Sequence, residues 1–165
     1  MVDIDGVRAA LRRAAVDRSA AALVATPDTV AEVSVAPGGR WVVRSHSIEW
    51  IGGPERLECW QVLTAGARPV THAKPPGWIH PAVGILWPEL LPIWGRMADS
   101  HRPDRLIDGA QGPGQLVLAR VDRPQSAPEP APDGCYLEID PVRWLCLQLE
   151  LPGKVWTLQE YHPSQ

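Results

Sequence analysis

The residue types best suited to catalysis stand together at Asp99, Ser100 and His101, which supply an acid, a hydroxyl and an imidazole. A catalytic triad usually assembles such groups from distant positions, because adjacent residues in a polar stretch point in different directions. We therefore interpret Asp99 or Ser100 as a capping residue near a helix end. No catalytic residue is assigned.

The histidines and cysteines lack the spacing of metal ligands. The five histidines form neither HxH nor HxxxH, and Cys59, Cys135 and Cys146 form no CxxC. Cys59 is expected within a strand, where no helix N-terminus or neighbouring cation would activate its thiol. These patterns predict packed thiols in a reducing compartment, with no metal and no cofactor.

The glycine-rich run 109–114 has the spacing of a phosphate-binding loop but not its chemistry. It lacks the lysine and the hydroxyl residue of a P-loop, and the residues after it have the pattern of a strand. A strand places no helix dipole against a phosphate. We expect a flexible connection there.

Tryptophan gives the clearest indication of a binding function. Trp78, Trp87 and Trp94 lie in a proline-rich stretch whose apolar density exceeds the needs of a loop and a short helix. The chain has eight Trp and no Phe, so part of this set replaces phenylalanine in an ordinary core. Two interpretations remain open: residues 78–94 close the core over the sheet, or they form the wall of an apolar pocket or docking surface.

Composition indicates one cytoplasmic domain over 1–165. The length suits a single core, and the net charge of −3 provides no basic surface for nucleic acid. Charged residues interrupt the first apolar residues, which argues against an export signal, and no stretch is long enough to cross a membrane. Residues 123–133 contain too many prolines for regular structure and predict a mobile loop.

The periodicity predicts an α+β domain, with an N-terminal helix packed on a curved, mostly antiparallel sheet. The helix is expected over 3–24 and a short helix or two helical turns over 88–94, with loop over 64–85 apart from a short extended piece near Val70. Strands are expected over 30–35, 40–50, 56–63, 115–122, 135–140, 143–151 and 154–161.

The last three strands allow a prediction of register. Two-residue turns at Pro141-Val142 and Pro152-Gly153 place Trp144 opposite Ile139 and Tyr161. Alternation then gives one dry face and a second face that is apolar at one end only. A half-apolar second face is typical of a groove, a partner surface or a second layer. The residues at its apolar end are Leu137, Ile139, Trp144, Cys146 and Tyr161.

The order of elements resembles the lipoprotein-carrier (LolA-like) superfamily, in particular small homologues from high-GC Gram-positive bacteria. The stretches that carry the resemblance are 86–91, 112–121 and 136–140, followed by Leu145 and Leu147. The resemblance covers about half of the chain, and residue 115 is Gln where the family pattern has Arg. It implies a half-barrel with a concave apolar face suited to a lipid or another apolar partner.

Together these patterns predict a non-enzymatic binding protein that holds a hydrophobic ligand or an apolar peptide segment on the concave face. The expected ligand-binding residues are Trp78, Trp87, Trp94, Trp144 and Tyr161. One alternative is a protein-interaction or regulatory subunit that acts with a partner protein. Another is a pocket-shaping cyclase or isomerase, for which the first residues to test are His46, Glu49, Glu58 and Asp99.

Overall fold

A computed structural model describes residues 3–46, 48–54, 56–61, 69–70, 78–110, 112–121 and 134–164. The expected mobile loop at 123–133 lies outside these residues, as does most of the expected loop at 64–85. The extended piece expected near Val70 is a two-residue strand.

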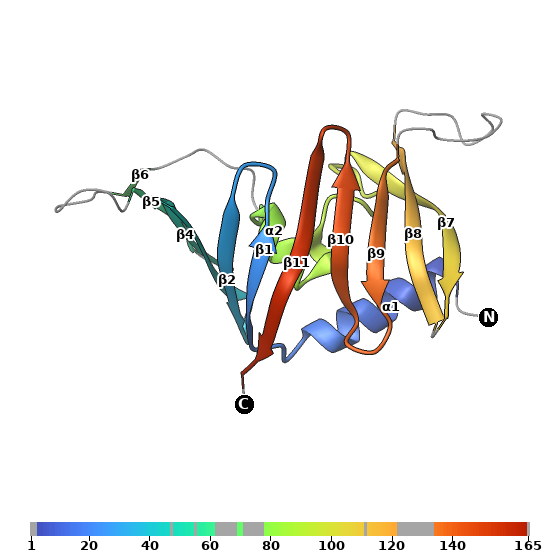
Figure 1. Ribbon diagram of the computed structural model, residues 1–165, viewed down its shortest axis with the longest axis horizontal. Coiled ribbons are helices and arrows are strands. Elements are labelled where there is room, and N and C mark those ends of the chain that lie inside the picture. The colour runs from blue at the N-terminus through green and yellow to red at the C-terminus, as the bar shows by residue number, and fades with distance from the viewer. Residues whose placement is uncertain are drawn as a thin grey trace.

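The described strands form one open antiparallel sheet of eleven strands (Figure 1). Its order is β6-β5-β4-β3-β2-β1-β11-β10-β9-β8-β7, so β1 and β11 join the two halves of the chain. The strands are β1 (Ala20–Ala25), β2 (Val30–Ala36), β3 (Arg40–Ser45), β4 (Ile48–Gly53), β5 (Arg56–Gln61), β6 (Pro69–Val70), β7 (His101–Gly109), β8 (Gly112–Arg120), β9 (Tyr136–Asp140), β10 (Leu145–Leu151) and β11 (Lys154–Pro163).

The N-terminal helix α1 (Ile4–Ala15) is shorter than expected. Its start follows the sequence, since the carboxylate of Asp3 accepts a hydrogen bond of 2.7 Å from the backbone N–H of Gly6. The second half of the predicted helix 3–24 is wrong, because Ala20–Ala25 is strand β1. Pairing with both β2 and β11 outweighs the helix propensity of its alanines.

The single strand expected over 40–50 is also wrong, because the chain turns back within it. His46 has a φ of 39°, and β3 and β4 pair as a hairpin in which Val43 lies opposite Trp50. In one continuous strand Trp41 and Trp50 would point to opposite faces, since they are an odd number of positions apart. The hairpin places both on the same face.

The sequence did not indicate strand β7, which forms one edge of the sheet. Four of its nine residues are charged, it contains Pro103, and its pairing with β8 shifts register at two places. Charge, proline and bulges are the usual protection of an edge strand against pairing with another chain. The same features remove the alternating pattern from which a strand is predicted.

The last three strands exist as expected, but the predicted register of β9 and β10 is wrong. A four-residue turn, 141–144, replaces the two-residue turn, and a bulge at Leu147 shifts the pairing. Ile139 lies opposite Cys146 and Leu137 opposite Leu149, and all four side chains are buried in one core. The predicted half-apolar second face is therefore not formed by these residues.

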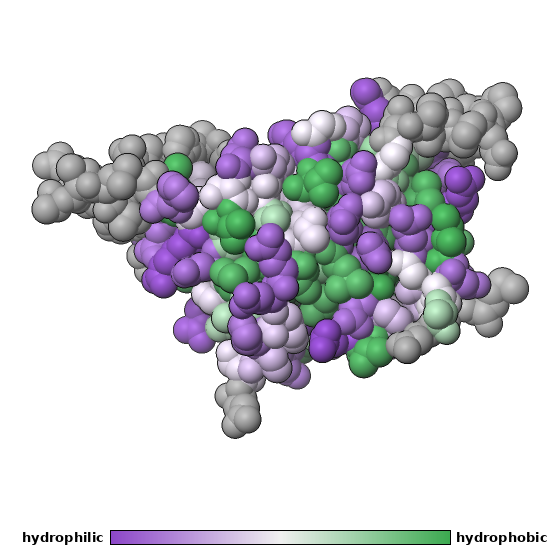
Figure 2. All heavy atoms as spheres, viewed as in Figure 1, coloured by the Kyte–Doolittle hydropathy of each residue, from purple (hydrophilic) through white to green (hydrophobic). Residues whose placement is uncertain are grey.

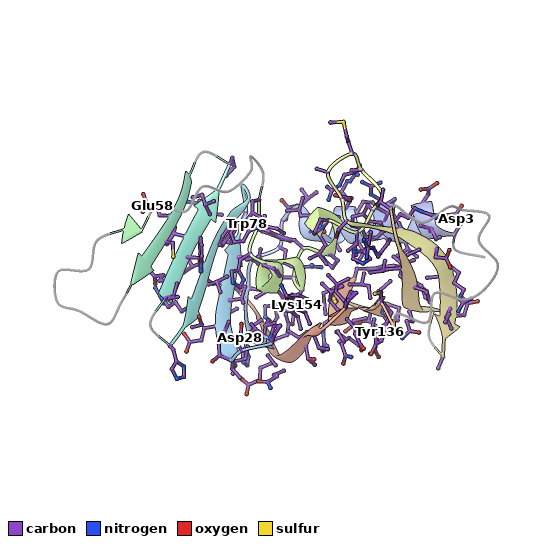
Figure 3. All side chains as sticks on the ribbon, turned by 90° about the horizontal axis from the view of Figure 1, so that it is seen from above. Asp3, Asp28, Glu58, Trp78, Tyr136 and Lys154 are labelled. Carbon is purple, nitrogen blue, oxygen red and sulfur yellow. The ribbon has the colours of Figure 1, made fainter. Side chains whose placement is uncertain are left out.

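The 78–100 segment connects the two edges of the sheet and contains the helix α2 (Pro81–Gly84) and the 3-10 helix η1 (Pro88–Leu90). Seen from above (Figure 3), the strands form an arc and α2 lies inside it. The segment buries Ile85, Leu86, Leu91 and Ile93 completely, in one cluster with sheet residues and with Val7 and Leu11 of α1. The core therefore lies between the sheet, α1 and this segment.

Candidate functional site

Two places in the structure bring together side chains that could bind a ligand. The first is a group of aromatic rings from β3, β4 and the start of the 78–100 segment, which we call the tryptophan cluster: Trp41, Trp50, Trp78 and His80. Trp41 is held there by Gly52 on the neighbouring strand. A Cβ atom at Gly52 would lie 2.1 Å from the Trp41 ring, so only glycine leaves room for the indole.

Trp78 is the centre of this cluster. Its ring centroid lies 5.3 Å from that of Trp50, 6.3 Å from that of Trp41 and 6.0 Å from that of His80. Trp50, Trp78 and His80 are half-buried, whereas Trp41 is buried. His80 is fixed by α2, because its Nδ1 accepts a hydrogen bond of 3.2 Å from the backbone N–H of Ala82. The cluster is thus a preformed aromatic surface beside the core.

Trp87 and Trp94 lie in a different environment, with only 4% and 7% of their surfaces exposed. The indole N–H of Trp94 donates a hydrogen bond of 2.9 Å to the carbonyl of Pro88, and the guanidinium of Arg8 lies 5.4 Å from the centre of its ring. Both tryptophans belong to the core cluster. They would reach a ligand on the concave face only if the 78–100 segment moved.

The second place is a cavity of about 360 Å³ between α1 and η1, which we call the α1–η1 pocket. Three buried polar atoms of its lining have no hydrogen-bond partner among the described residues: Arg8 Nε, Trp87 Nε1 and Glu89 Oε2. Unpaired buried polar atoms are rare in native proteins, and each one needs an explanation. The lining residues are Arg8, Arg12, Ala15, Val16, Gly39, Trp87, Glu89, Leu90 and Arg96.

Burial raises the pKa of Glu89 from 4.5 to about 7, although its own backbone, Arg18 and Arg12 lower it in part. The cause is desolvation, which disfavours the charged carboxylate. At neutral pH this carboxyl therefore exists in both protonation states. A carboxyl whose pKa is shifted toward neutral pH within a cavity is typical of a binding or catalytic site.

Arg96 also lines the pocket, but its Nε and one of its terminal nitrogens already have partners. Its Nε donates to the carboxylate of Asp99 at 3.0 Å, and its terminal nitrogen donates to the Leu91 carbonyl at 2.6 Å. The same carboxylate accepts a 2.9 Å hydrogen bond from the backbone N–H of Trp94. Asp99 is thus a structural acceptor that stabilises the loop between Trp94 and Ser100.

Trp144 and Tyr161 lie near a third feature, the buried guanidinium of Arg18. This side chain donates to the carbonyls of Leu86, Arg143 and Trp144, at 2.9 Å for Arg143 and 3.0 Å for Trp144. It joins the chain after α1, the 78–100 segment and the turn before β10. The five residues that the sequence predicts as ligand-binding are therefore in three different settings.

The groups considered for an enzyme do not converge in the structure. The Ser100 hydroxyl lies 2.9 Å from His101 Nδ1, but Asp99 is directed toward Trp94 and Arg96. His46 is exposed in its turn, and Glu49 pairs with Arg44 on the sheet surface. Glu58 lies on β5, opposite Ile51.

Among the described residues, the cysteine thiols and the possible metal ligands also do not form a common site. Cys59, Cys135 and Cys146 are buried outside any disulfide, and burial raises the pKa of the Cys146 thiol. Within the described ranges, no group of three or more His, Cys, Asp or Glu side chains is placed to hold a metal ion. In the same part of the chain, none of the helices has the length and apolarity needed to cross a membrane.

A larger cavity, about 580 Å³, lies at the ends of β2, β3 and β4 and includes Trp41 of the tryptophan cluster in its lining. Its lining includes Val42 and Ile51, which point to the face opposite the tryptophan cluster. Figure 2 shows that outer face, where apolar and polar residues interleave. None of the five residues predicted as ligand-binding lines this cavity.

Sequence reasoning missed most residues of both sites. Trp41 and Trp50 were hidden by the unrecognised turn at His46. Signals for the pocket were present: Arg8 and Arg12 are four positions apart, so they share a helix face, and Glu89 is a single carboxylate in an apolar stretch. What the sequence did not contain was the approach of α1 to η1.

Comparison with known proteins adds no relative to this description, since no protein-family model, no curated protein and no solved structure matches the chain.

Proposed function

We propose that the protein is a non-enzymatic binding protein that holds an apolar ligand, a hydrophobic small molecule or an apolar peptide segment, on the concave face of a half-barrel. The open order of the sheet and the arc of its strands support the half-barrel (Figure 3). The 78–100 segment lies inside the arc, which supports its role as the cover of the binding face.

The tryptophan cluster is the observation that carries this proposal. Its half-buried rings lie on the face whose remaining apolar residues are packed in the core. Rigid aromatic rings provide a large contact area with little loss of conformational entropy on binding, so they are common where apolar ligands are held. Trp50 and Trp78 are the residues whose faces a ligand would contact first.

A titration with a neutral fluorescent probe, N-phenyl-1-naphthylamine, tests the proposal on the full chain. We expect Trp78→Ala to weaken probe binding at least fivefold while circular dichroism shows a folded protein. Trp144→Ala is the matched control, because Trp144 is also half-buried but lies near Arg18. It should bind the probe as the wild type does.

A wild type that does not bind the probe, or a Trp78→Ala variant that binds it unchanged, would contradict the proposal. Absence of probe binding together with stable co-purification of another chain would favour the protein-interaction subunit instead. Equal losses of probe affinity in Trp78→Ala and Trp144→Ala would mean that the binding surface also includes the region near Arg18.

A further inference from the structure

The polar half of the α1–η1 pocket contains two buried hydrogen-bond donors that have no partner in the described part of the chain. Arg8 Nε–H and Trp87 Nε1–H are donors, and both are buried without a partner among the described residues. Trp87 is itself 96% buried, because 4% of its surface is exposed, so its donor cannot turn toward bulk water. A ligand that pairs with both donors must present acceptor oxygens.

The positions of these donors are fixed in advance. Arg8 is held by its stacking on Trp94, and Trp87 by its packing in the core. Fixed donors lose little entropy when a ligand binds, which is typical of a site formed for recognition. Nothing comparable occurs at Arg18, where the guanidinium is satisfied by backbone carbonyls.

The charges of the lining residues indicate the sign of the charge that a ligand would carry. Arg96 is neutralised by Asp99, so the charges left in the pocket are those of Arg8, Arg12 and Glu89. Their sum is +1 when Glu89 is ionised and +2 when it is protonated. A protonated Glu89 also becomes a third donor toward an anion, next to Arg8 and Trp87.

The rest of the lining is apolar. Ala15, Val16, Leu90 and the ring of Trp87 form it, and the volume of about 360 Å³ exceeds what an inorganic ion fills. We propose that the α1–η1 pocket binds a small organic anion, with a carboxylate or phosphate head group on Arg8, Arg12 and Trp87 and a short apolar body beside Leu90. This site is separate from the tryptophan cluster and does not depend on the function proposed there.

Calorimetric titration of the full chain with octanoate, octyl phosphate, octanol and inorganic phosphate tests the proposal. We expect at least one of the two amphiphilic anions to bind at least tenfold more tightly than octanol. The preferred anion distinguishes a carboxylate from a phosphate head group. Inorganic phosphate should bind more weakly than either, because it lacks the apolar body.

Variants then locate the site. Arg12→Gln and Trp87→Phe should each weaken anion binding about tenfold, whereas Arg13→Gln, an exposed arginine of the same helix outside the lining, should change it less than twofold. Two results would overturn the proposal: octanol binding as tightly as both anions, or no binding of any probe at millimolar concentration. Equal losses in Arg13→Gln and Arg12→Gln would do the same, since they would indicate only general attraction by the charge of α1. The Trp78→Ala variant should bind the anion normally, so failure of one site is distinguishable from failure of the other.

Discussion

Two clusters of buried polar groups lie one residue apart on the 78–100 segment, and they differ in how they are satisfied. At Leu86 the carbonyl accepts a hydrogen bond from Arg18, whose other donors reach the carbonyls of Arg143 and Trp144. At Trp87 the indole N–H lacks a partner among the described residues. The first cluster contains Arg18, and the second contains Arg8, whose Nε also lacks a partner among those residues. Both arginines come from the N-terminal part of the chain.

The difference separates structure from recognition. A buried charge that is fully hydrogen-bonded stabilises one arrangement of the chain, and its removal leaves several carbonyls without donors. Buried donors and acceptors without a partner in the lining of a cavity cost stability, and a ligand that pairs with them would recover that cost. We therefore assign Arg18 to the fold and the α1–η1 pocket to binding.

The largest expected effect is at Arg18. Arg18→Met keeps the length of the side chain but removes all of its donors, so we expect the free energy of unfolding to fall by about 3 kcal/mol. Urea denaturation at pH 7 measures this change. Arg18→Lys is the control and should lose less, because an ammonium group still reaches some of the carbonyls. A Met variant as stable as the wild type would remove the contrast between the two clusters.

Local sequence patterns predicted some elements of the fold and missed others. Local patterns predicted most strands correctly, for example β2 and β11, where alternation and a Pro-Gly turn agree with the sheet. The prediction of the end of α1 failed, because an alanine-rich stretch such as Ala20–Ala25 becomes a strand only by pairing with β2 and β11. The β9–β10 register failed because a bulge has no clear local signature.

The candidate sites were less predictable than the fold. Trp78 was expected as a ligand-binding residue, and it lies in an aromatic cluster, but its neighbours Trp41 and Trp50 were not expected. Arg8 and Glu89 are more than eighty residues apart in sequence and meet only because α1 packs near η1. Such sites depend on tertiary contacts, which single-sequence periodicity does not describe.

An intermediate effect is expected at Glu89, and it depends on pH. The pKa of this carboxyl is about 7 in the folded protein and 4.5 without burial, so the folded state binds more protons than the unfolded state between these values. Its stabilising contribution is complete below about pH 4.5 and is lost as pH rises through about 7. The full shift corresponds to about 3 kcal/mol, and partial exposure of the side chain reduces this to about 1–2 kcal/mol.

Glu89→Gln removes the titration while keeping the shape of the side chain. We expect the variant to be more stable than the wild type at pH 8 by about 1–2 kcal/mol, and similar to it at pH 5. Urea denaturation at both pH values measures the difference. A stability difference that is the same at pH 5 and pH 8 would mean that Glu89 titrates normally, and its part in the pocket would then rest on geometry alone.

The smallest effect compares two tryptophans of the same segment. Trp87 and Trp94 are both buried, but only Trp94 has a hydrogen bond from its indole N–H, to the Pro88 carbonyl. Replacement by Phe shrinks both rings similarly, so Trp94→Phe should lower the free energy of unfolding by about 1 kcal/mol more than Trp87→Phe does. Only Trp87→Phe also removes an unpaired donor from a residue that lines the pocket.

Paired urea denaturation of the two variants measures this difference, and the anion titration gives an independent readout. Trp87→Phe should lose anion affinity with the smaller loss of stability, whereas Trp94→Phe should lose more stability while its donor set in the pocket stays complete. If the Trp87 variant were instead the less stable one, its indole N–H would have a structural partner in solution. The unpaired donor would then belong to the fold, as Arg18 does, and the pocket would lose one of the groups that define its ligand.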